Sequence, residues 1–201
     1  MTTFLLVRHA TCDPVGRSLA GRAPGVRLDA DGRAQAHRLA ARLAAAPLAA
    51  VYSSPLERAR ETAAAIAERA GVAVETHDGL TELDVGAWTG RTFAELAPDD
   101  LWRRFNSFRG GTRPPRGELM LEAQARAVAA LLGLRDRHPS GVVAAVSHAD
   151  VIKGIVAHVA GIPLDLTHRL EVSPASVSVV TIDAEGARLL RLNETGEREY
   201  R

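Results

Sequence analysis

Short apolar runs alternate with longer amphipathic segments along this chain, and that order restricts the fold more than any other feature of the sequence. The runs that favour strands are residues 3–8, 48–54, 72–77 and 142–148. The segments that favour helices are residues 28–46, 54–71, 117–141 and 149–161. Strands that alternate with helices are typical of a largely parallel sheet with helices on both faces. The sequence therefore predicts an α/β fold with three layers, α/β/α.

The C-terminal part of the chain departs from this alternation. Residues 176–183 and 186–194 both favour strands, and only a short turn at residues 184–186 separates them. Two strands joined in this way predict an antiparallel hairpin. We expect the hairpin at the edge of the sheet, so that a mostly parallel sheet carries an antiparallel edge strand.

Capping residues mark the predicted starts of two helices. Asp29 or Asp31 is suited to cap the helix at residues 28–46. Ser54 and Pro55 predict that the next helix begins there, with Ser54 as N-cap and Pro55 at the first helical position. Gly71 predicts its end.

Composition restricts the class of protein. The 201 residues, of which 46% are hydrophobic, suffice for one well-buried domain, which we expect to span residues 1–201. A formal net charge of +1 provides no basic field for a nucleic acid or an anionic membrane, and no apolar run approaches membrane-spanning length. The only cysteine, Cys12, has no partner for an internal disulfide, and the first residues do not resemble a secretory signal. We therefore expect a cytoplasmic protein.

Residues 87–117 interrupt the alternation of strands and helices. They contain both tryptophans and three of the four phenylalanines, followed by a run rich in glycine and proline. This segment is either a lid-like insertion over a site or an ordinary connecting helix with a surface loop. Core packing is the simplest role for its aromatic side chains.

Polar residues follow several of the apolar runs, where ligands gather in open α/β sheets. They are Arg8 and His9, then Ser53, Ser54 and Arg58, then Glu82, and finally His148. A lone histidine or arginine at a strand end is usually a solvated or hydrogen-bonded side chain. The two histidines, two arginines and one glutamate of this set, converging on one edge of the sheet, favour a functional site.

This set suits phosphoryl transfer. Each guanidinium can donate two parallel hydrogen bonds to phosphate oxygens. A neutral histidine can attack phosphorus and form a phosphohistidine, while Glu82 protonates the leaving alkoxide and then activates water. His148 can donate to the phosphoryl oxygens as charge develops on them. The scheme requires no metal, and the sequence lacks metal-ligand spacing.

Nearly the whole chain resembles the histidine phosphatase superfamily, which includes cofactor-dependent phosphoglycerate mutases and many small phosphatases. Five segments carry the likeness in order: LVRHA (6–10), GRAPGVRLDADGRAQA (21–36), VYSSPLERARETA (51–63), LTELDVGAWTG (80–90) and VVAAVSHAD (142–150). The resemblance implies a phosphoglycerate mutase-like fold, a phosphohistidine mechanism and no metal or other cofactor. It implies catalytic roles for Arg8, His9, Arg58, Glu82 and His148. It further suggests substrate contacts by Thr11, Arg22, Glu118 and Ala149.

The chain departs from the family pattern at several positions. Ala10 replaces a glycine, which would strain the backbone if that position needs a positive φ. The segment CDPVGRS (12–18) offers no phosphate-binding asparagine, for which Thr11 or Ser18 is a candidate substitute. Arg116 and Leu119 replace a glycine and a serine in the segment PPRGELM (114–120).

Cys12 raises an alternative, because CDPVGRS looks at first like the loop of a cysteine-dependent phosphatase. That loop has five residues between its cysteine and its arginine, whereas four separate Cys12 from Arg17 here. Pro14 also removes one of the N–H donors of such a loop. We therefore expect Cys12 to lie near the pocket without taking part in the reaction.

We predict a metal-independent phosphomonoesterase that acts on a small phosphorylated metabolite through a phosphohistidine. The alternatives are a phosphoglycerate mutase-type phosphomutase, which needs a lid that excludes water, and a catalytically weak phosphate-binding domain. Six arginines of the insertion leave two interpretations open: a substrate with charge beyond its phosphate, or a solvated helix face. They are Arg91, Arg103, Arg104, Arg109, Arg113 and Arg116. The sequence leaves a homodimer open.

Overall fold

The computed structural model describes residues 1–196, which form a single six-stranded sheet in the order β3-β2-β4-β1-β5-β6. The strands are β1 (Thr2–Arg8), β2 (Leu48–Ser53), β3 (Val74–Thr76), β4 (Val142–Ser147), β5 (Val177–Ile182) and β6 (Ala187–Glu194). The first four strands run parallel, while β5 lies antiparallel to β1 and pairs with β6 in a hairpin at the edge. The predicted mostly parallel sheet with an antiparallel edge is confirmed.

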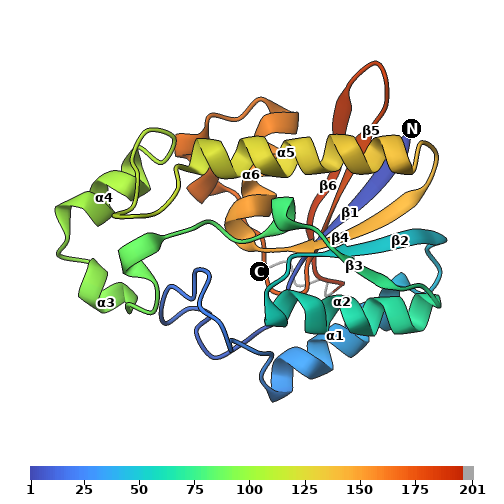
Figure 1. Ribbon diagram of the computed structural model, residues 1–201, viewed down its shortest axis with the longest axis horizontal. Helices are drawn as coiled ribbons and strands as arrows, with labels where there is room; N and C mark the ends of the chain where they lie inside the picture. The colour runs from blue at the N-terminus through green and yellow to red at the C-terminus, as the bar shows by residue number, and fades with distance from the viewer. Residues whose placement is uncertain (197–201) are drawn as a thin grey trace.

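Helices cover both faces of this sheet (Figure 1). One face carries α1 (Ala30–Leu43) and α2 (Glu57–Ala70), and the other carries α5 (Met120–Arg137) and α6 (Ala149–Ala160). The remaining elements are η1 (Asp78–Leu80), η2 (Gly86–Trp88), α3 (Phe93–Leu96), α4 (Asp100–Ser107) and η3 (Leu164–Arg169). None of the helices within residues 1–196 is long and apolar enough to cross a membrane.

The central strand β1 supplies side chains to two apolar cores, one on each face of the sheet. Phe4 and Leu6 pack beneath α5 and α6, whereas Leu5 and Val7 pack beneath α1 and α2. Successive side chains of a strand point to opposite faces, and both faces of this sheet are covered. This explains why the sequence of β1 is a continuous apolar run.

The starts of the two predicted helices differ in outcome. Asp29 caps α1, because its carboxylate accepts a hydrogen bond from the Gly32 N–H at 2.6 Å. The predicted start of α2 is wrong: the helix begins at Glu57, and the N-cap position is Leu56, without a side-chain hydrogen bond. The Ser54 hydroxyl instead accepts from the Leu56 N–H at 3.3 Å, in a turn that precedes the helix. It also contacts the ring of His148, which ties it to the site described below.

Residues 87–117 pack around an apolar cluster of their own at one end of the molecule. Trp88 and Phe105 are buried there with Leu83 and Met120, and Trp102 packs against them. Figure 1 shows α3 and α4 projecting beyond the end of the sheet. The aromatic side chains therefore hold this segment against the start of α5.

Substitution of two helical glycines by alanine should change the free energy of unfolding in opposite directions. A Cβ at Gly32 in α1 would collide with the carbonyl oxygen of Thr11, whereas a Cβ at Gly133 in α5 would meet nothing. We expect Gly32→Ala to lower the free energy of unfolding by about 1–3 kcal/mol through overpacking. The matched Gly133→Ala should raise it by about 0.5–1 kcal/mol, because alanine favours helix. Urea unfolding followed by circular dichroism measures both; equal effects would show that the Thr11 contact yields without cost.

Candidate active site

The site lies at the carboxyl edge of three adjacent strands. Because β2, β4 and β1 are parallel neighbours, the residues that follow them meet at one edge of the sheet. The backbone holds them in place: the His9 N–H donates to the Ser147 carbonyl at 2.9 Å, and the Ser54 N–H donates to the Val146 carbonyl at 2.9 Å. Pairing within the sheet therefore sets the positions of His9, Ser54 and His148.

His9 is almost fully buried, and within residues 1–196 only one of its ring nitrogens has a hydrogen-bond partner. Its Nδ1 lies 2.7 Å from the Ala10 carbonyl oxygen, so Nδ1 carries the proton and donates. The lone pair of Nε2 is thereby left available. Burial, followed by the charge of Arg58, lowers the pKa of His9 to about 3. The imidazole is therefore neutral at physiological pH.

His148 lies beside His9, with ring centroids 5.1 Å apart. Its Nε2 is 2.8 Å from the Ser54 hydroxyl, and its Nδ1 faces Glu82 at 3.8 Å from Oε2. Burial lowers the pKa of His148 well below its usual value, and the nearby His9 and Arg58 act in the same direction. When the Ser54 hydroxyl donates to Nε2, the N–H of the ring lies at Nδ1.

Arg8 and Arg58 bring two positive charges to the same place. Arg58, in the first turn of α2, is 1% exposed, and its Nη2 donates to the Gly21 carbonyl at 2.8 Å. Arg8, the last residue of β1, donates from Nη1 to the Val172 carbonyl at 2.6 Å. Burial lowers the pKa of both guanidinium groups, but arginine remains charged in proteins.

Several buried nitrogen atoms around His9 have no hydrogen-bond partner. Within residues 1–196 they include Nε of Arg8, Nε and Nη1 of Arg58, and Nδ1 of His148. Buried donors are normally satisfied, because leaving one unpaired costs free energy. The unsatisfied donors include those of two cationic guanidinium groups. An oxyanion bound here could accept hydrogen bonds from all of them.

Glu82 approaches this cluster from the loop after η1. Its Oε1 accepts from the Leu83 N–H at 2.8 Å. Burial, and secondly the charge of Asp150, raise the pKa of Glu82 to about 7, against the opposing effect of Arg58. At neutral pH the carboxyl group is thus present in both protonation states, as a group that gives and then takes a proton requires.

A cavity of about 190 Å³ opens onto these residues. Its wall includes Arg8, His9, Arg58, Glu82 and Ala149, which brings Ala149 together with four of the five residues assigned catalytic roles. The fifth, His148, is fully buried, and its ring contacts that of His9. The cavity is smaller than the roughly 300–1,000 Å³ of pockets for drug-sized molecules, so it suits a small ligand.

Arg22 and Glu118 were expected to contact substrate, but the structure does not place them in the cavity wall. They form an ion pair with each other at 2.6 Å. Arg22 also donates to the Glu82 backbone carbonyl at 2.8 Å, and Glu118 accepts from the Asp84 N–H at 2.9 Å. Arg126 of α5 completes the network by donating to both Glu82 and Glu118. These side chains hold the backbone at residues 82–84 and support Glu82 from behind.

Thr11 is also outside the cavity wall, and its N–H donates to the side-chain oxygen of Gln35 at 2.9 Å. Ala10 has a negative φ, so this alanine does not strain the backbone. The Ala10 N–H donates to the Thr62 hydroxyl at 3.0 Å and is thus occupied. Among the positions at which this chain departs from the family pattern, Arg116 adopts a φ of 60°, in the region that favours glycine.

Cys12 lines the cavity, as expected, but its thiol is suited to a passive role. Burial raises its pKa, the reverse of the shift that a nucleophilic thiolate needs. Ser18 lies in the cavity wall as well, from the same loop. No group of three or more His, Cys, Asp or Glu side chains suited to a metal ion occurs in the part of the chain that the structure describes.

Sequence reasoning assigned no role in the site to two residues that the structure places there. Ser54, predicted as a helix cap, contacts His148, and Asp150 lines the cavity two residues after His148. The position of Ser54 at a strand end was a signal for the first. Asp150 had only its place next to Ala149 as a signal, because the first turn of any helix favours aspartate.

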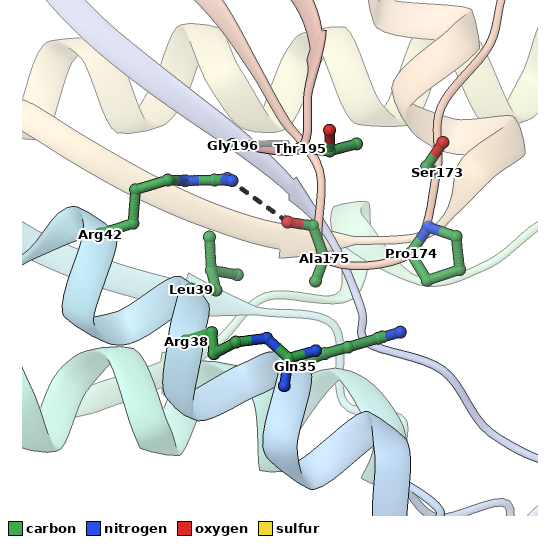
Figure 2. Close-up of a pocket in the computed structure, with 9 residues that line it drawn as sticks. All are labelled: Gln35, Arg38, Leu39, Arg42, Ser173, Pro174, Ala175, Thr195 and Gly196. Atoms are coloured by element: carbon green, nitrogen blue, oxygen red, sulfur yellow. Dashed lines mark hydrogen bonds between the residues drawn. The ribbon is translucent and has the colours of Figure 1, made fainter. Parts of the chain in front are cut away.

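A second cavity, of about 480 Å³, lies between α1 and the loop before β5 (Figure 2). Arg42 crosses one side of it and donates to the Ala175 carbonyl at 3.5 Å. Gln35 and Ala175 line this cavity and also bind the backbone of residues 8–11, Gln35 through Thr11 and Ala175 through Arg8 and His9. The loop that carries His9 is therefore braced from its far side.

Comparison with known proteins assigns the family. A family model described as the histidine phosphatase superfamily (branch 1) matches residues 4–195. A bifunctional protein of Mycobacterium tuberculosis is 36% identical over 97% of this chain, which spans about half, 54%, of that relative's length. Phosphoserine phosphatase 1 of Hydrogenobacter thermophilus is 32% identical over 97% of this chain and 93% of its own. A protein of Yersinia enterocolitica named as a probable phosphoglycerate mutase is 32% identical over 90% of this chain and 85% of its own.

Solved structures agree with these relatives. Bacillus stearothermophilus YhfR superimposes with a TM-score of 0.90 at 30% identity, covering 96% of this chain and 98% of its own. A mycobacterial glucosyl-3-phosphoglycerate phosphatase does so with a TM-score of 0.85 at 26% identity, over the same shares of the two chains. The fold is thus that of phosphoglycerate mutase-like phosphatases, and the chain belongs to the histidine phosphatase superfamily.

Proposed function

We propose that this protein is a phosphomonoesterase that hydrolyses a small phosphorylated metabolite through a phosphohistidine formed on His9. The observation that carries the proposal is the cluster of unpartnered buried nitrogens of Arg8, Arg58 and His148 around the free Nε2 of His9. Relatives named as phosphatases and as a phosphoglycerate mutase support phosphoryl transfer as the general activity.

In this proposal the phosphoryl group of the substrate occupies the cluster of unsatisfied donors. The guanidinium groups of Arg8 and Arg58 donate to its oxygens, and His148 donates from Nδ1. Because these donors already lack partners, the ligand replaces no existing protein hydrogen bond. They also lie where negative charge accumulates during transfer, so they stabilise the transition state.

His9 is the proposed nucleophile. Its low pKa keeps the ring neutral, and the hydrogen bond from Nδ1–H to the Ala10 carbonyl leaves the lone pair of Nε2 available on a residue that lines the cavity. Nε2 forms a bond to phosphorus while the bond from phosphorus to the ester oxygen breaks. The phosphoryl group is then carried on His9.

Glu82 is the proposed acid and base. Its protonated form gives a proton to the departing ester oxygen, and the resulting carboxylate takes a proton from the water that attacks the phosphohistidine. A pKa of about 7 makes both steps accessible at neutral pH. Water must reach the cavity for hydrolysis, and residues 87–117 place only Phe93 in its wall. We therefore favour hydrolysis over transfer to a second substrate.

The proposal retains three expectations from the sequence. The chain is taken as one domain whose residues 87–117 act as a lid-like segment beside the cavity. Its ligand is a small phosphorylated metabolite, a class to which phosphoserine, named for one relative, belongs. The protein is assigned to the cytoplasm.

Substitution of the proposed nucleophile tests the function. We expect His9→Ala to lower the hydrolysis of p-nitrophenyl phosphate, assayed in EDTA, by at least about 10³-fold. The matched control His37→Ala removes an exposed histidine of α1 and should leave the rate unchanged. Protein quenched in alkali should carry a phosphoryl group that is stable to base and labile to acid, and only when His9 is present.

Other results would contradict this function in distinguishable ways. Hydrolysis that survives in His9→Ala would remove His9 from the reaction. Faster isomerisation than hydrolysis of 3-phosphoglycerate would indicate a mutase. Stabilisation by phosphate or vanadate without turnover of any ester would indicate a phosphate-binding domain.

The role of Glu82 as an acid is tested by the choice of leaving group. We expect Glu82→Gln to lower kcat/KM for an alkyl phosphate such as glycerol 3-phosphate by roughly 10²-fold or more, because an alkoxide needs a proton to leave. The effect on p-nitrophenyl phosphate should be much smaller, since nitrophenolate leaves without protonation. Equal losses for both esters would show that Glu82 acts in binding or folding only.

The raised pKa of Glu82 predicts a dependence of stability on pH. Since this pKa rises from 4.5 to about 7 on folding, the folded protein binds the proton more tightly than the unfolded chain. Its stabilising contribution is complete below about pH 4.5 and disappears as the pH approaches 7. Between about pH 5 and pH 8, the free energy of unfolding of the wild type should fall by about 2 kcal/mol more than that of Glu82→Gln. Urea unfolding at both pH values measures this, and parallel curves would contradict it.

A further inference from the structure

We infer that Asp150 determines substrate specificity, by selecting phosphate esters of sugars or polyols over esters whose leaving group carries a carboxylate. The inference rests on the proposed function, since it concerns the alcohol part of the ester hydrolysed there. It separates this chain from relatives whose named substrates, phosphoserine and glucosyl-3-phosphoglycerate, contain a carboxylate.

Asp150 lies in the cavity wall next to Ala149, in the first turn of α6. Its side chain is 24% exposed, and its Oδ2 accepts from Nη2 of Arg109 at 2.6 Å. Its charge adds to the effect of burial on the pKa of Glu82 and opposes the effect of burial on the pKa of Arg8, as expected for a carboxylate near both groups. Asp150 is therefore a carboxylate beside the space that the leaving group must occupy.

The arginines of residues 87–117 do not supply a cation for a substrate carboxylate. Arg103 pairs with Asp100, and Arg113 pairs with Glu122. None of the six arginines belongs to the cavity wall within the described chain. Of the two interpretations that the sequence left open, a substrate with charge beyond its phosphate therefore gains no support from these arginines.

Arg109 has a positioning role rather than a binding one in this arrangement. Its guanidinium lies 4.7 Å from the centre of the Phe105 ring, and its side chain is only 14% exposed. The stacked ring and the ion pair together fix the orientation of Arg109, which in turn holds one oxygen of Asp150. Within the described residues, Arg109 does not bind the other carboxylate oxygen of Asp150, Oδ1.

The rest of the cavity wall suits a hydroxylated carbon chain or ring. Leu19, Val85 and Phe93 present apolar surface, and Phe93 stays 38% exposed despite its size. Such surface packs against the C–H groups of a sugar or polyol, while Asp150 accepts a hydrogen bond from a hydroxyl. A carboxylate in the same place would meet a like charge.

Two esters with the same three-carbon skeleton test this inference. Glycerol 3-phosphate carries a hydroxymethyl group at the position where 3-phosphoglycerate carries a carboxylate. We expect wild-type kcat/KM to favour glycerol 3-phosphate by about tenfold or more, given the strength of like-charge repulsion at close range. In Asp150→Asn this preference should shrink by about tenfold, because the amide keeps the shape and removes the charge.

The matched control is Glu171→Gln. Glu171 is exposed and lies outside the cavity wall, although its charge also acts on Arg8. Removing it should leave the ratio between the two esters unchanged. If Asp150→Asn does not fold, as judged by circular dichroism, Asp150→Ser takes its place in the same comparison.

The outcomes separate this inference from the proposed function. A wild type that prefers 3-phosphoglycerate, or a ratio that Asp150→Asn leaves at the wild-type value, overturns the role of Asp150. If p-nitrophenyl phosphate is still hydrolysed in that case, the proposed function stands. Absence of hydrolysis of all three esters overturns both.

Discussion

Buried positive charge at the carboxyl edge of the sheet is the constraint on which the rest of this structure depends. Arg58 is 1% exposed, and taking a charge out of water costs several kcal/mol unless partners compensate. The fold supplies Arg58 and Arg8 with one backbone carbonyl each, from Gly21 and Val172, and leaves their remaining buried nitrogens unpaired. The fold therefore bears a free-energy cost that a bound oxyanion would relieve.

The same burial gives neighbouring groups different protonation states. For His9, burial and the charge of Arg58 act in one direction and favour the neutral ring. For Glu82 they oppose each other, and burial dominates, so the carboxyl group holds its proton up to about pH 7. A nucleophile and an acid with suitable protonation states thus arise from one environment, because desolvation disfavours whichever form is charged.

Much of the fold and part of the site could be predicted because they depend on local patterns. A strand that ends in a polar residue shows where His9 and His148 lie, and parallel pairing brings them together. The ion pair of Arg22 with Glu118 could not be predicted, because long side chains from distant segments choose their partners only in three dimensions. Ser54 was assigned to a helix start for a similar reason, since a hydroxyl that caps a helix and one that contacts an imidazole look alike in sequence.

The Ser54 hydroxyl has a consequence for how this site can evolve. It accepts from the Leu56 N–H just before the helix that carries Arg58, and it also contacts Nε2 of His148. One oxygen atom thus couples the placement of an arginine to the orientation of a histidine 94 residues further along the chain. Substitutions on the two sides of this atom should show epistasis, so that drift at either side is tolerated only with compensation at the other.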